Sequence, residues 1–519
     1  MTSADATLRA LLAYALILPA AVIVGYFVGT PTDFTSLAIM ALLMGILTFP
    51  LFLKWHFPLL MLTWNMTALA FFLPGRPQLW ILMAVVSLFI SVSQRTLTRN
   101  KEFLHVPSVT APLVFLTAVV IVTAYFRGGI GVASLGSEVV GGRRYILILV
   151  GVMGFFAMIG NRIPVEKAHL YIGLFFLGAV LNAIGSTASF VPQWLYPIFW
   201  MFPVTTNDLG SLNASVFRES IDRFQGLTLA SEAVFCYVLA RYGLRDTFER
   251  GRVLRVLLLI GAAALGSMGG FRSLFVTMTL IFVITFFFEG LFRTKYAVLL
   301  AGVAIFFGAF LVPFADKLPL SMQRTLSVLP LKLDPVARIS AQGSSEWRIE
   351  MWKTVWPEVG HYFWLGRGLA IEAADLGMTT EMERRGTASS QELAMLAGDY
   401  HSGPLSSIIP FGVWGAIGWI WFLIAAWRAL HKNYHYGDPE LKQINTFLLA
   451  YFTAKLIFFT TVFGNFYSDL PFFVGIVGFS FALNGGIRQP AVASSAVQPL
   501  RQPRLVQDAI PAGVAAMRH

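Results

Sequence analysis

The sequence predicts an all-α polytopic membrane protein that crosses the bilayer about 12–14 times. Two observations lead to this class. Hydrophobic residues make up 56% of the 519 residues and charged residues only 13%, with a mean hydropathy of +0.69, a more apolar composition than soluble domains have. The charged residues lie mostly between apolar runs, each near the roughly 20 residues that a helix needs to cross the hydrocarbon core.

Short turns separate several of these runs, so the number of crossings depends on how the turns are interpreted. The first run begins after Arg9 and lacks a convincing small-x-small cleavage site, which favours an uncleaved first helix over a signal peptide. The sole cysteine, Cys236, lies inside a run, so no disulfide can form within the chain. The runs cover residues 10–29, 35–53, 57–73, 78–94, 108–126, 145–160, 168–190, 227–241, 253–269, 272–289, 296–314, 405–427, 445–463 and 470–486.

The distribution of Lys and Arg between the runs predicts the orientation in the membrane. With the N-terminus in the cytoplasm, most basic residues fall in inner loops, among them Arg95, Arg162 and Lys442. The formal net charge of +11 is then a topology signal that also attracts anionic lipid headgroups. We therefore expect the lipid bilayer as a partner and no nucleic acid.

On this topology the chain divides into four parts. Residues 1–314 hold transmembrane helices 1–11 and an outer segment at 191–226. Residues 315–404 form a large periplasmic loop, and residues 405–487 hold transmembrane helices 12–14. The polar tail 488–519, with its Pro, Ala, Gln and scattered Arg, is predicted to be disordered on the cytoplasmic side.

The large outer loop contains one segment with a clear helical pattern. In SSEWRIEMWKTVWPEV (344–359), Trp347, Met351, Trp352 and Val355 recur at helical spacing. An amphipathic helix of this kind can rest on the membrane surface or pack within the outer loop, and packing is the commoner of the two.

Three arginines on the outer side are candidates for phosphate binding. Arg272 lies in the tight hairpin SMGGFRSLF (267–275), Arg223 just before the eighth run, and Arg348 near the start of the amphipathic segment. Because guanidinium groups bind phosphate bidentately and carry a charge at every working pH, converging arginines can clamp a diphosphate. The alternatives are snorkelling or headgroup anchoring for Arg223 and Arg272, and for Arg348 an ion pair with a neighbouring glutamate.

His401, in DYHSG (399–403), is the candidate general base. A neutral imidazole can take a proton from a hydroxyl as a bond forms, although an isolated loop histidine is more often structural. Asp399 and Ser402 adjoin it, but the nucleophile elbow of a serine hydrolase is missing. No HExxH motif, cysteine pair or histidine–carboxylate cluster has the spacing of metal ligands, so we expect no metal.

The sequence around His401 carries a family resemblance. His401-Ser402, nine further residues and then Gly412-x-x-Gly415 resemble the H-[N/S/Q]-x9-G-x-x-G pattern of the O-antigen ligase and O-antigen polymerase superfamily. SMGGFRS is similar to the serine–arginine turn of that superfamily, with Phe271 in place of the serine before the arginine.

Two further segments carry the same resemblance. Residues 347–370 are similar to a segment of that superfamily in which an arginine is followed by a tryptophan and then by P-x-x-G-x-G. Gly366 and Gly368 are its glycines here, although the proline lies further upstream than usual. Residues 223–233 resemble the R-x-x-G segment. These segments occur in the same order as in the superfamily over roughly residues 220–430. The N-terminal half resembles the superfamily only in its succession of apolar runs long enough to span a membrane.

The resemblance implies a glycosyltransferase of the GT-C type on the periplasmic face of the bacterial inner (cytoplasmic) membrane. Such enzymes move a glycan from an undecaprenyl-diphosphate carrier to an acceptor hydroxyl, with inversion and without a metal or other cofactor. The matching positions imply His401 as general base and Arg272 and Arg348 as diphosphate ligands, with Arg223 as a helper.

Two questions about function stay open at this point. In a ligase the acceptor is lipid A-core or, in related enzymes, a protein, whereas in a polymerase it is the next lipid-linked repeat. The departures from the motifs and the extra spans favour a polymerase-like member. A transporter or flippase of lipid-linked sugars is the competing class. Transporters place ionisable groups at mid-membrane, whereas here the candidates cluster at the outer surface, with Glu232 in the eighth run as the main exception.

Overall fold

The structure is a computed structural model, and it confirms the all-α polytopic class. It describes residues 34–73, 75–97, 103–131, 139–204, 223–249, 251–385 and 390–490, with isolated residues between 15 and 25. Within these residues, eight helices are long and apolar enough to cross a membrane, and three shorter apolar helices accompany them. The described part also holds a short antiparallel ladder of β1 (Val139–Val140) with β2 (Ile371–Glu372) and an isolated β-bridge between Leu69 and Gln78.

The helices follow the predicted runs closely from residue 78 onward. The run 168–190 is an α-helix continued by a 3-10 segment, η3 (Gly178–Thr187). The α-helices are α2 (Phe34–Thr63), α3 (Leu79–Leu97), α4 (Pro107–Arg127), α5 (Gly142–Ile159), α6 (Ala168–Leu177), α7 (Ile198–Met201), α9 (Gln225–Thr247), α10 (Val253–Met268), α11 (Arg272–Phe288), α12 (Lys295–Phe314), α13 (Leu320–Leu326), α14 (Pro335–Val355), α15 (Glu358–His361), α16 (Ala373–Arg384), α17 (Ser390–Leu396), α18 (Gly403–Tyr436), α19 (Lys442–Thr461) and α20 (Phe466–Asn484).

The structure differs from the sequence-based division in the second and third runs. The predicted break between 35–53 and 57–73 does not occur, because α2 continues unbroken to Thr63. The polar residue at the expected break, His56, is buried and shares a hydrogen bond of 2.8 Å with Ser87 of α3, so it is tolerated inside the bundle. The first run and the tail from residue 491 fall outside the described residues, apart from isolated positions in the first.

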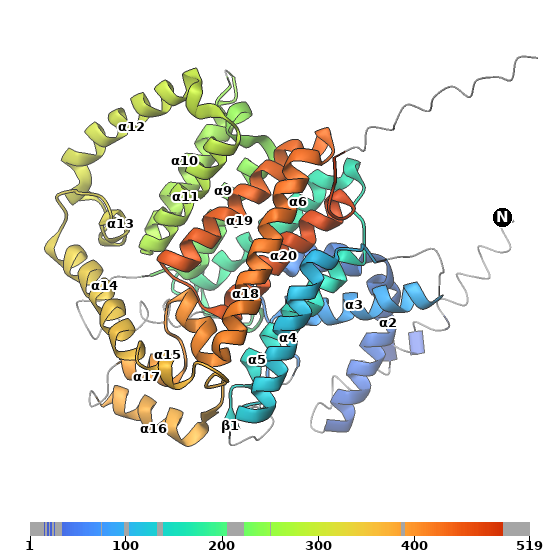
Figure 1. Cartoon of the computed structure of the whole chain (residues 1–519). Helices are drawn as coiled ribbons and strands as arrows, with labels where there is room; N and C mark the ends of the chain where they lie inside the picture. Colours follow the sequence, from blue (N-terminus) through green and yellow to red (C-terminus); the bar gives the residue numbers. More distant parts are fainter. Residues whose placement is uncertain are drawn as a thin grey trace, which may run out of the picture.

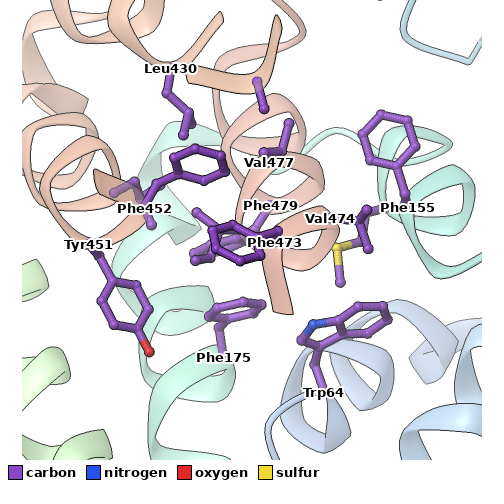
Figure 2. Packing of buried hydrophobic residues seen from close by; sticks show 14 of the residues in the cluster. Trp64, Phe155, Phe175, Leu430, Tyr451, Phe452, Phe473, Val474, Val477 and Phe479 are labelled. Atoms are coloured by element: carbon purple, nitrogen blue, oxygen red, sulfur yellow. The ribbon is translucent and has the colours of Figure 1, made fainter. Parts of the chain in front are cut away.

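The C-terminal helix α20 lies at the centre of the bundle and packs along α5. Figure 2 shows the aromatic layer around it, in which Phe479 stacks on Phe175 with ring centroids 4.6 Å apart. Trp64 reaches the same layer, where a Cβ on Gly475 would lie 2.0 Å from its indole nitrogen. This close packing gives the helix pair α19–α20 a rigid support.

Glu232, the ionisable residue predicted inside a span, bridges two helices. Its carboxylate lies 2.6 Å from the Lys455 ammonium of α19 and accepts a hydrogen bond from the Tyr451 hydroxyl at 3.3 Å. Pairing of this kind is how a bundle accommodates charge at membrane depth. Glu232 therefore links α9 to α19.

The outer loop folds against one end of the bundle, which we call the site end. Helices α14 to α17 gather there beside β1 and the start of α18 (Figure 1). The amphipathic helix begins at Pro335, earlier than its apolar pattern indicates, with the Asp334 side chain capping its first turn. Its buried residues Met351 and Val355 pack against the start of α18, so its apolar face packs against protein.

Candidate active site

The hairpin between α10 and α11 presents Arg272 at the site end. Gly270 adopts a φ of +73°, a left-handed conformation that glycine tolerates without strain. A Cβ on Gly269 would lie 2.1 Å from the Thr228 hydroxyl of α9, so glycine is required for this close approach. The Phe224 amide donates to the Gly269 carbonyl at 3.1 Å, which brings the preceding residue, Arg223, to the same hairpin.

A fourth arginine, Arg324 of α13, joins this hairpin to α14. It is only 3% exposed, and its guanidinium donates to the Gly270 carbonyl and, at 3.1 Å, to the Ser340 hydroxyl. Arg324 is not among the arginines predicted from the sequence, because α13 is a seven-residue helix in the outer loop and matches no motif. Its sole signal in the sequence is an arginine within a short apolar segment of that loop.

Helix α14 supplies Arg348 and a contact to Arg272. The Arg272 guanidinium donates to the Ser345 hydroxyl at 3.1 Å, one turn before Arg348. The alternative for Arg348, an ion pair with a neighbouring glutamate, is not formed in the described part of the chain. Glu350 instead accepts a hydrogen bond from Gln391 at 3.2 Å, while the Arg348 guanidinium lies 5.6 Å from the ring centroid of Phe463.

The four arginines form a cluster of positive charge, which we call the arginine cluster. Burial lowers the pKa of Arg223, and burial with the charges of other members of the cluster lowers the pKa of Arg348. Burial, followed by the charges of Arg223, Arg272 and Arg348, lowers the pKa of Arg324 to about 9, so its guanidinium is still protonated at neutral pH. None of the four pairs with a carboxylate among the described residues. Repelling, half-buried cations without a counterion indicate an anion-binding site.

His401 lies beside this cluster in a strained conformation. Its φ of +49° is a left-handed value uncommon outside glycine, and strain of this kind concentrates at functional sites. The ring lies between Trp347 and Phe463, with centroids 5.1 and 5.0 Å away. Burial lowers the pKa of His401, Asp399 raises it and Arg348 lowers it, with a net shift below the ordinary 6.5. The imidazole is therefore neutral at neutral pH and able to accept a proton.

The glycines of the resembling motifs pack against one another. Helix α18 is kinked at Gly412, which has a φ of +65°, and a Cβ there would lie 2.7 Å from the Trp364 carbonyl. Gly366 has a φ of +71°, and its Cβ would lie 2.2 Å from the Pro410 carbonyl. The amides of Arg367 and Gly368 donate to the Ile409 and Pro410 carbonyls at 2.8 and 2.9 Å. The two motifs thus form one backbone junction that ties the end of α14 to the helix after His401.

Gly366→Ala is expected to disrupt this junction. Both the positive φ and the carbonyl 2.2 Å away oppose a methyl group, so the loss of stability should be about 1–3 kcal/mol, with reduced activity. Thermal unfolding in detergent measures the first effect. Gly343→Ala, on the open face of α14 with nothing within 4 Å of its Cβ, is the control and should leave the unfolding temperature unchanged or slightly raised. Equal unfolding temperatures for the two variants would contradict the junction.

Two cavities adjoin the arginine cluster. One of about 430 Å³ is polar and is lined by Arg272, Ser345, Gln342 and Glu346, among others. The other, of about 210 Å³, is lined mainly by apolar side chains of α10 and α11, and by Thr325 next to Arg324. The first cavity thus includes Arg272 of the cluster, and the second reaches the neighbourhood of Arg324 through Thr325.

Comparison with known families bears on the segment that contains most of this site. Residues 253–420 match a family model described as O-antigen ligase. This match confirms the resemblance to the O-antigen ligase and polymerase superfamily. No curated protein matches the chain.

The O-antigen ligase match supports glycan transfer of the O-antigen ligase type by a multi-pass membrane protein. The family implies lipid-linked glycan substrates in a membrane environment. The matched segment contains Arg272, Arg324, Arg348 and His401, whereas Arg223 lies before it. The described residues hold no group of three or more His, Cys, Asp or Glu side chains suited to a metal ion.

Proposed function

We propose that the protein is an inverting glycosyltransferase of the bacterial inner membrane that moves a glycan from an undecaprenyl-diphosphate carrier to an acceptor hydroxyl. One observation carries the proposal: an arginine cluster, with no carboxylate paired to it among the described residues, lies beside a strained, neutral histidine at one end of an apolar bundle. A lipid diphosphate supplies the missing negative charge. The O-antigen ligase match supports the same class of donor.

The residues have separate roles in the proposed step. His401 takes the proton of the acceptor hydroxyl as that oxygen bonds to the anomeric carbon of the donor glycan. The bond from this carbon to the diphosphate breaks on the opposite face, and its electron pair leaves with the diphosphate. The arginine cluster stabilises the charge that develops there, which is the main electrostatic contribution to such a transition state. Attack opposite the leaving group inverts the anomeric configuration.

The two cavities support an amphiphilic donor. The apolar cavity runs along Leu274, Met278 and Phe282 of α11, directly below the hairpin that presents Arg272. A diphosphate held by the arginine cluster would therefore have an apolar space on its membrane side for the start of the isoprenoid chain. The polar cavity lies on the other side of Arg272, where sugar hydroxyls would find side chains to bind.

The distribution of charge supports a periplasmic site. Helix α20 begins beside the site end and ends near Arg162, which approaches Gly485, and α19 begins at Lys442 on that same opposite end. Basic residues favour the cytoplasmic side, so the site end faces the periplasm.

Reconstitution with a lipid-linked glycan tests the proposal. Purified protein in liposomes should release undecaprenyl diphosphate, and the acceptor should gain the mass of the glycan. A product on lipid A-core identifies a ligase, and an elongated lipid-linked glycan identifies a polymerase. Transfer of the intact lipid across the liposome, without bond cleavage, would identify a transporter and refute the proposal.

The dependence of activity on pH provides a further prediction. Because His401 must be neutral and its pKa lies below the usual 6.5, activity should persist at mildly acidic pH and fall only as the pH drops through this lowered value. The acid limb of kcat/KM measures the pKa in the free enzyme. An acid limb above 6.5 would contradict the assignment of His401 as base.

A further inference from the structure

The turn between α19 and α20 reaches the site from outside the segment matched by the family model. A Cβ on Gly464 would lie 2.8 Å from the Cα of Gly403, so this turn packs tightly against the loop that carries His401. The Phe466 amide donates to the Ser406 hydroxyl at 2.9 Å. Residues of the turn are therefore held in a fixed position relative to His401.

Asn465, in this turn, contacts the carboxylate beside His401. Its Nδ2 donates to Asp399 Oδ1 at 2.8 Å, while Asp399 Oδ2 lies 3.8 Å from His401 Nε2. A carboxylate only accepts, so the amide must present its nitrogen to Asp399. The other imidazole nitrogen, Nδ1, has no hydrogen-bond partner in the described part of the chain.

A structural role does not account for this asparagine. Asn465 is the N-cap residue of α20, a position where asparagine normally accepts a hydrogen bond from the first turn, yet its side chain makes no such bond. It is only 4% exposed, and its Oδ1 is left without a partner among the described residues. Burying an amide oxygen without a partner costs stability, so capping of α20 does not explain this side chain.

We propose that Asn465 is a positioning residue that acts through Asp399. It holds the carboxylate so that, after a small movement of the ring, Asp399 can accept a hydrogen bond from one imidazole N–H of His401, which leaves the lone pair of the other nitrogen for the acceptor proton. This inference rests on the proposed function and adds to it the tautomer of the base and the residues that select it.

The charged groups around His401 determine how the pH dependence of activity should change in the variants. Asp399 on the same loop raises the pKa of His401, and Arg348 on α14 lowers it. On α20, the Asp469 carboxylate accepts a hydrogen bond of 2.7 Å from the backbone N–H of Asn465 and is therefore already engaged. Removing the charge of Asp399 should therefore move the acid limb of activity to lower pH. Releasing Asp399 from Asn465 should move it in the same direction, by less.

A double-mutant cycle tests the inference. Asn465→Ser keeps a residue that suits an N-cap but cannot reach Asp399, and Asp399→Asn removes the carboxylate. Each is expected to lower kcat roughly tenfold or more with little change in the KM for the donor. In the Asp399→Asn background, Asn465→Ser should cost nothing further. If the two losses of kcat multiply in the double variant, or if neither substitution moves the acid limb of activity, the inference is overturned.

Controls separate this inference from the proposed function. Ser468→Ala removes a 3.1 Å hydrogen bond to the Asn465 carbonyl in the same turn without touching Asp399, and should leave kcat and the acid limb unchanged. If a His401 variant stays fully active, the proposed role of His401 as base fails, and the inference fails with it. If that variant is inactive but the Asn465 and Asp399 effects multiply, only the inference fails. Should Asn465→Ser not fold, Asn465→Ala replaces it in the same cycle.

Discussion

His401→Asn is expected to abolish release of undecaprenyl diphosphate, with a rate loss of roughly a hundredfold to ten-thousandfold. Asparagine is the informative replacement because it tolerates the left-handed conformation that His401 adopts at a φ of +49°, so the loop should keep its shape while losing its base. Release of the lipid product from a reconstituted donor measures the effect. His401→Ala removes the same base but adds backbone strain, so it should be at least as impaired.

His361→Ala is the matched control for the base. His361 is the other histidine of the outer loop; it is exposed, and its Nδ1 lies 3.2 Å from the Pro357 carbonyl, away from the arginine cluster. Its loss should leave turnover unchanged. Undiminished product release by His401→Asn would show that the hydroxyl is deprotonated by another group.

Arg272→Lys is expected to lower kcat/KM for the donor by roughly tenfold to a hundredfold, although the charge is kept. Lysine offers a point charge in place of the planar fork that binds two phosphate oxygens at once. The Arg272 guanidinium can donate to Ser345 of α14 through one nitrogen and to a ligand through another. A lysine side chain has a single nitrogen for both contacts. Initial rates at varied donor concentration measure the loss.

Arg385→Lys is the matched control for this change. Arg385 is exposed and forms an ion pair of 2.8 Å with Glu381 in the outer loop, so the same substitution there should have no effect on turnover. Wild-type kcat/KM in Arg272→Lys would mean that the diphosphate is bound without bidentate contact at this position.

Much of the site could be predicted because its signals are local in the chain. The tight hairpin before Arg272 follows from its two glycines, and the helix that carries Arg348 follows from the spacing of its apolar residues. Arg324 and Asn465 could not be found this way. Arg324 reaches Gly270 across 54 positions in the chain, and Asn465 reaches Asp399 across 66, so no local pattern reports either contact.

The sequence by itself determined the membrane class, most helix positions and the residues most suited to bind phosphate and to accept a proton. These follow from hydropathy, charge and residue chemistry, which are properties of short segments. Only the tertiary structure decided that four arginines share one site, that no carboxylate in the described part of the chain pairs with them, that the motif glycines form one backbone junction, and that α2 is a single helix. The reason is physical: burial, close approach and loss of counterions arise when distant segments pack together, and a one-dimensional pattern does not contain those distances.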